Sequence, residues 1–164
     1  MDPTMWFANL SPEFAIMLIS MIPITELRAS IPIGIEVYDL PIMKVWILAV
    51  IGDIIPAIAL LLFFPIVNKW MIRTKFLGDI VTKKLQHAEK SFSGKYKKYG
   101  VIGLIIFVGI PLPLTGSWTG SLAAFVFGIP FKKSAPLITI GVCVAATLVT
   151  LITLFAGGTI RAIF

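Results

Sequence analysis

The chain has 164 residues, of which 58% are hydrophobic and only 13% are charged. A soluble domain is usually about 45–50% apolar and about 25% charged, so this composition excludes an ordinary soluble protein. The net charge is +6, and nine of the fourteen Lys and Arg residues lie between Asn68 and Tyr99. Such a basic stretch in apolar surroundings is typical of a cytoplasmic loop under the positive-inside rule, and it argues against a nucleic-acid partner.

Apolar segments dominate the rest of the chain. From Val45 to Val67 the only charge is Asp53, and from Ser134 to Ile160 there is none. At about 1.5 Å per residue, each of these blocks reaches across a hydrocarbon core of roughly 30 Å, which predicts two transmembrane helices. In chain order the segments are Met5–Met21, Ile22–Val37, Pro41–Val67, the basic loop Asn68–Tyr99, Gly100–Phe131 and Ser134–Ile160.

Prolines interrupt the remaining apolar sequence, at Pro23 and Pro32 in the first half and at Pro111 and Pro113 in the second. The runs between the breaks are about half a bilayer long, which predicts re-entrant hairpins that enter and leave on one side. The alternative is one kinked spanning helix in each half, giving four spans. Hairpins place eleven Lys and Arg inside and two outside, against ten and three for four spans, so the positive-inside rule slightly favours hairpins.

The two halves resemble each other. Pro23-Ile24-Thr25 aligns with Pro113-Leu114-Thr115, and after one gap Pro41, Lys44, Gly52 and Ala57 align with Pro130, Lys133, Gly141 and Ala146. We therefore predict an all-α integral membrane protein with a single domain, residues 1–164, built as an inverted repeat. Residues 5–67 and 100–164 would each form a re-entrant helical hairpin plus a full transmembrane helix, and residues 68–99 a basic cytoplasmic helical loop. Inverted repeats with broken helices are a transporter architecture.

Three charged residues, Glu26, Arg28 and Asp53, fall within this apolar sequence. Burying such a group costs at least about 2.5–3.5 kcal/mol, so each is a candidate functional residue. Glu26 and Asp53 are candidates for proton or ion coupling. Thr25 is expected to cap the helix that begins beside it. Arg28 should point away from Glu26 and bind another anion, either Asp53 or a ligand. A purely structural ion-pair network is the alternative.

A helix N-terminus is expected after the second break. Its free N–H groups and nearby hydroxyls favour an anion. With Arg28 they form the predicted substrate-binding set, whose other members are Thr115, Gly116, Ser117, Trp118, Thr119 and Gly120. Close helix packing through small residues is the alternative. The sequence offers no nucleophile–base pair, metal-ligand cluster or phosphate-binding loop, so we expect no enzyme, no cofactor and no metal.

The segments Pro23–Pro32 (PITELRASIP) and Pro111–Gly120 (PLPLTGSWTG) resemble the two motifs of the small multidrug export protein family. The resemblance extends over nearly the whole chain and implies roles for Glu26, Arg28 and the stretch Thr115–Gly120. That family resembles a branch of the DedA superfamily, whose members share paired re-entrant hairpins that face each other. Some DedA-like relatives are implicated in flipping phospholipids or polyprenyl phosphates, coupled to protons in bacteria.

An arginine and a helix N-terminus favour an anion, whereas an exporter of lipophilic cations needs an acidic pocket. We therefore expect a multi-pass cell-membrane transporter or flippase, coupled to protons or another ion, for an anionic amphiphile such as a phosphate-bearing lipid. A proton-coupled small multidrug exporter of organic cations and a membrane-embedded scaffold or assembly factor remain alternatives. We also expect a homodimer, with anionic membrane lipids bound at the basic loop.

Overall fold

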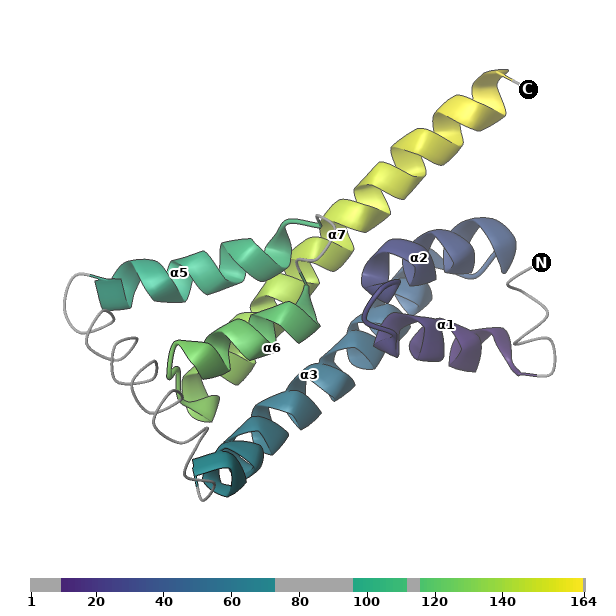
Figure 1. Ribbon diagram of the computed structural model, residues 1–164. Coiled ribbons are helices and arrows are strands. Elements are labelled where there is room, and N and C mark those ends of the chain that lie inside the picture. The colour runs from purple at the N-terminus through teal and green to yellow at the C-terminus, as the bar shows by residue number, and fades with distance from the viewer. Residues whose placement is uncertain (1–9, 73–95, 112–115, 164) are drawn as a thin grey trace.

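In a computed structural model, residues 10–72, 96–111 and 116–163 are described, and every regular element among them is a helix (Figure 1). The all-α prediction is therefore confirmed for this part of the chain. In order, the elements are α1 (Pro12–Met21), α2 (Glu26–Pro32), the π-helix η2 (Ile33–Val37), α3 (Ile42–Ile72), α5 (Tyr96–Gly109), α6 (Ser117–Val126) and α7 (Phe131–Ile163).

Helices α3 and α7, of 31 and 33 residues, form the centre of the fold. Their segments Ile42–Phe64 and Phe131–Ala156 are long and apolar enough to cross a membrane, as the sequence predicts. Each helix begins directly after one of the aligned prolines, Pro41 and Pro130. The two helices lie side by side and run in opposite directions (Figure 1).

The shorter helices pair within each half of the chain. Ser11 accepts a hydrogen bond from the backbone N–H of Phe14 and so caps α1, which is 10 residues long. The chain then reverses at Pro23–Thr25, and α2 packs against α1. In the second half α6 packs against α5. We call α1, α2 and η2 hairpin A, and α5 and α6 hairpin B. Figure 1 shows that the two hairpins point toward each other.

Hairpin A differs from the prediction at two residues. Pro32 lies inside a helix and does not break the helical segment, which continues into η2. Proline has no N–H for the helical ladder, and the backbone accommodates it by continuing into the π-helical turn of η2. Thr25 occupies the N-cap position of α2 without a side-chain capping bond. Its hydroxyl donates instead to the carbonyl of Ile19, at 2.7 Å, and so holds the turn against α1.

The predicted basic loop is helical at both ends. Asn68–Ile72 continue α3, and Tyr96–Tyr99 form the first turn of α5. The remainder of this loop lies outside the described residues, as do Pro113 and Thr115.

Two glycines that align in sequence allow the hairpins to approach the long helices closely. A Cβ on Gly52 of α3 would lie 2.5 Å from the backbone oxygen of Met17 in α1. A Cβ on Gly141 of α7 would lie 2.7 Å from Cβ of Val108 and 3.2 Å from the backbone oxygen of Ile105, both in α5. Hairpin A therefore packs on α3 at Gly52, and hairpin B packs on α7 at Gly141.

The second helix of each hairpin also contacts the long helix of the other half. Helix α2 packs against α7, and α6 packs against α3. The core is accordingly one cluster of buried side chains drawn from both halves. The aligned residues Ala57 and Ala146 both belong to it. Large apolar side chains also cover the outward faces of α3 and α7, among them Ile51, Ile55 and Ile152. An apolar exterior of this extent is typical of a surface that faces lipid.

Candidate functional site

Glu26 lies where hairpin A reaches the opposite half of the molecule. It is the first residue of α2 and is buried, with 6% of its surface exposed. Its backbone has a φ of 44°, in the left-handed region that non-glycine residues rarely adopt. Such a conformation costs of order 1–3 kcal/mol and persists only where the surroundings impose it. It marks the point at which the turn of hairpin A passes into α2.

The Glu26 carboxylate occupies the N-terminus of α6. It accepts a hydrogen bond from the backbone N–H of Trp118, in the first turn of that helix. The N-cap of α6 is Gly116, which has no side chain to cap the helix itself. A Cβ at Gly116 would collide with both carboxylate oxygens of Glu26. The anion that the sequence predicted at this helix N-terminus is therefore supplied by the protein itself.

Arg28 does not point away from Glu26, so this prediction is wrong. Its Nη2 atom lies 3.7 Å from Oε2 of Glu26. The expectation assumed that both residues lie on a regular helix, where side chains two positions apart face different directions. Glu26 has left-handed backbone angles, which orient its side chain differently. About a quarter of the Arg28 side chain remains exposed (26%), against 8% of that of Glu26.

Asp53, in the middle of α3, is the third charged residue near Glu26 and Arg28. It is 1% exposed, and its Oδ1 atom accepts a hydrogen bond of 2.8 Å from the hydroxyl of Ser117 in α6. One turn later, the hydroxyl of Ser121 lies 3.1 Å from the carbonyl oxygen of Ala57. These two bonds attach one face of α6 to α3. The cluster of Glu26, Arg28 and Asp53, which we call the charged cluster, thus lies between α2, α3 and the start of α6.

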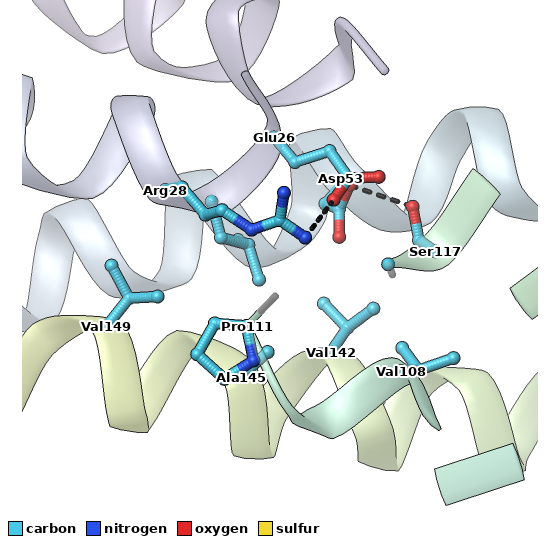
Figure 2. A pocket seen from close by; sticks show the side chains of 11 residues that line it. Glu26, Arg28, Asp53, Val108, Pro111, Ser117, Val142, Ala145 and Val149 are labelled. Atoms are coloured by element: carbon cyan, nitrogen blue, oxygen red, sulfur yellow. Dashed lines mark hydrogen bonds and ion pairs between the residues drawn. The ribbon is translucent and has the colours of Figure 1, made fainter. Parts of the chain in front are cut away.

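A small cavity adjoins the charged cluster (Figure 2). Glu26, Arg28, Asp53 and Ser117 form its polar side. Its apolar side is formed by Leu27, Val108, Pro111, Val142, Ala145 and Val149. The cavity has room for about one water molecule, whereas sites for drug-sized ligands are about 300–1,000 Å³. In this arrangement the cavity is too small for a drug-sized ligand.

The predicted substrate-binding residues do not all meet at this cavity. Arg28, Gly116 and Ser117 line it. The Thr119 hydroxyl bonds to the carbonyl of Gly116, within its own helix turn. A Cβ on Gly120 would collide with Val108, so that glycine serves close packing, the alternative interpretation of this stretch. Trp118 contributes its backbone N–H, while its indole Nε1 is buried without a hydrogen-bond partner among the described residues.

The apolar wall was not predicted from the sequence. Val142, Ala145 and Val149 recur at three- and four-residue spacing on α7, so they share one face of that helix. Figure 2 shows this face opposite Glu26, Arg28 and Asp53. The site therefore combines an ionic side with an apolar side.

A protein-family model described as "Putative small multi-drug export protein" matches residues 26–148. The chain belongs to this family. The match begins at Glu26 and extends through α3, α5 and α6 to Leu148 of α7, so it includes the whole charged cluster. No curated protein and no solved structure matches the chain.

Membership of an export-protein family agrees with the two helices that are long and apolar enough to span a bilayer. Together they indicate a membrane protein. In that setting, the charged cluster is surrounded by protein on a scaffold whose outer surface is apolar. Ionisable groups placed in this way are rare in membrane proteins and commonly mark substrate or proton pathways.

Proposed function

We propose that the protein is a proton-coupled exporter of small amphipathic molecules in the cell membrane, with Glu26 and Asp53 as the proton-carrying groups. One observation carries the proposal: two carboxyl groups and one guanidinium group converge on a buried cavity between the two halves of the fold. With both carboxyl groups ionised, the charged cluster has one net negative charge. A low-dielectric interior disfavours an uncompensated charge. A bound proton or a cationic group of the substrate compensates it.

The packing of the helices supports an inverted repeat with two re-entrant hairpins. Helix α1 packs on α3 as α5 packs on α7, and α2 packs on α7 as α6 packs on α3. The long helices run in opposite directions and carry aligned glycines at equivalent contacts. The hairpin helices, of 10 to 14 residues for α1, α5 and α6, are too short to span a bilayer singly. We propose that each hairpin enters the membrane from its own side and that residues 68–99 are cytoplasmic.

The balance of charge favours a cationic substrate. The α6 N-terminus, which the sequence suggested for a substrate anion, already holds the Glu26 carboxylate. Arg28 lies beside the same carboxylate. A substrate anion would have to displace Glu26, whereas a cation could replace a proton at Glu26 or Asp53. A lipophilic cation could in addition place its apolar groups against the α7 wall.

A second candidate is a flippase for an anionic amphiphile such as a phosphate-bearing lipid. The observation that favours it is the partial exposure of the Arg28 side chain (26%) at the cavity. If Glu26 becomes neutral, Arg28 and the N–H groups of α6 are available to a phosphate.

The homodimer, the lipid-binding loop and the absence of enzymatic activity remain predictions.

The two candidates differ in the ligand that stabilises the protein. We would measure the thermal stability of the detergent-solubilised protein with tetraphenylphosphonium or with a polyprenyl phosphate. A ligand present at about 100 times its Kd stabilises the folded state by roughly 2.7 kcal/mol. For the exporter, we expect tetraphenylphosphonium to stabilise the wild type and Arg28→Gln but not Asp53→Asn. Binding should also release protons into weakly buffered solution.

Lys44→Gln is the matched control for loss of a charge, because Lys44 is exposed and contacts Glu13, away from the charged cluster. It should respond to ligands as the wild type does. Stabilisation by polyprenyl phosphate in the wild type and not in Arg28→Gln would replace the exporter by the flippase. A well-folded protein that responds to neither ligand would contradict both candidates.

A further inference from the structure

The contact between Glu26 and α6 joins the two hairpins directly, in addition to the packing of both hairpins on α3 and α7. Glu26 belongs to hairpin A, whose first helix packs on α3 at Gly52. Helix α6 belongs to hairpin B, whose first helix packs on α7 at Gly141. The carboxylate bridges the hairpins at the buried cavity between them. Any separation of the hairpins at this point must break that contact.

Glu26 takes the place of a capping side chain for α6. An N-cap side chain normally accepts a hydrogen bond from the N–H groups of the first helical turn. Gly116 at the N-cap supplies none, and the Glu26 carboxylate accepts the Trp118 N–H in its place. The missing Cβ of Gly116 is also what makes room for the carboxylate. Gly116 therefore leaves α6 without a cap of its own and leaves space for the Glu26 carboxylate to act as the cap.

We propose that the Glu26 carboxylate is a protonation-controlled clasp between the two hairpins. Ionised Glu26 caps α6, pairs with Arg28 and holds the hairpins together, and protonated Glu26 releases α6 and opens the cavity. The clasp rests on the proposed function for its supply of protons, but its test measures the separation of the hairpins and involves no substrate.

The charge of Glu26 decides the strength of the clasp. An ionised carboxylate is attracted by the positive end of the α6 dipole and by the Arg28 guanidinium, and protonation removes both attractions. Asp53 of α3 is the other titratable group that faces Glu26. From α5, α6, α7 and the chain between α5 and α6, the described cavity residues are Val108, Pro111, Gly116, Ser117, Val142, Ala145 and Val149, none of which has a carboxyl or amine side chain.

The test is a distance measurement by double electron–electron resonance on the full chain. Spin labels are attached at Ile24→Cys in hairpin A and Leu122→Cys in α6, both exposed positions, in a Cys143→Ala background. Distances are recorded from about pH 9 to about pH 4, which spans ordinary and perturbed carboxyl groups. We expect the distance to lengthen as the pH falls.

Variants separate the clasp from other causes. Glu26→Gln, which carries no charge, should show the long distance at every pH. Gly116→Ala, whose Cβ would displace the carboxylate, should do the same while Glu26 stays titratable. Gly103→Ala is the control for adding a methyl group, since a Cβ there meets no atom within 4 Å. It should behave as the wild type does.

Circular dichroism and size-exclusion chromatography identify variants that do not fold. Because Gly116→Ala and Glu26→Gln each test the clasp, one of them suffices if the other does not fold. A wild-type pH response in folded Glu26→Gln overturns the proposal. So does a response that is lost in Asp53→Asn but retained in Glu26→Gln, because Asp53 would then be the controlling group. A pH-dependent distance with no binding of tetraphenylphosphonium or polyprenyl phosphate would leave the clasp standing and remove the proposed function.

Discussion

The hydrogen bond from Ser117 to Asp53 permits a quantitative prediction. Both residues are almost completely buried, and the distance from the Ser117 hydroxyl to Oδ1 of Asp53 is 2.8 Å. A hydrogen bond to a charged group contributes about 1.5–3 kcal/mol, against about 0.5–1.5 kcal/mol for a neutral pair. Ser117→Ala leaves the Asp53 carboxyl without this donor. We therefore expect the free energy of unfolding to fall by about 1.5–3 kcal/mol if Asp53 is ionised.

Ser121→Ala provides a matched control on the same helix. Ser121 lies one turn after Ser117, is equally buried, and also contacts α3, but its hydroxyl bonds to carbonyl oxygens of Ala57 and Ser117. Its removal should cost no more than about 0.5–1.5 kcal/mol. The assay is equilibrium unfolding in mixed detergent micelles at neutral pH. Equal costs for the two variants would refute the view that Ser117 supports a buried charge.

Two further predictions concern contacts in which Glu26, Arg28 and Asp53 take no part. Gly52→Ala and Gly141→Ala should each lower the thermal midpoint, since the added Cβ would lie 2.5 and 2.7 Å from atoms of the facing hairpin, whereas Gly103→Ala should be neutral or slightly stabilising. Lys44 lowers the pKa of Glu13, so their pair should stabilise the folded state at neutral pH and lose this effect as the pH falls through the pKa of Glu13. The thermal midpoint of Lys44→Gln should lack that pH dependence. A pH dependence equal to that of the wild type would contradict the stabilising role of the pair.

The sequence predicted the framework well because its signals are long. Two long apolar blocks predicted α3 and α7, and the breaks at Pro23 and Pro111 predicted where α1 and α5 end. Glu26, Arg28 and Asp53 were predicted as candidate functional residues from the cost of burying charge. The structure does bring these three residues to one cavity.

The contacts within the site were less predictable, because they depend on backbone details. The predicted direction of Arg28, away from Glu26, was wrong because periodicity assumes regular helix angles, and Glu26 has a φ of 44°. The i, i+4 spacing of Ser117 and Ser121 is a signal that could have identified the α6 face toward α3. The wall of Val142, Ala145 and Val149 was missed because these residues are apolar like many of their neighbours in α7, and no charge marks this face of the helix.

The second helix of each hairpin packs on the long helix of the other half, and this packing has a consequence for biogenesis. Asp53 and the Ser117 that donates to it are 64 residues apart, in helices of different halves. In the topology that we propose, α3 therefore enters the membrane with the Asp53 carboxyl group before its donor Ser117 has been synthesised. The first half of the chain is a poor candidate for independent folding, and premature termination after α3 should yield a fragment recognised by quality control. Once the second half has been synthesised, Asp53 and Glu26 of the first half acquire their hydrogen-bond donors in α6.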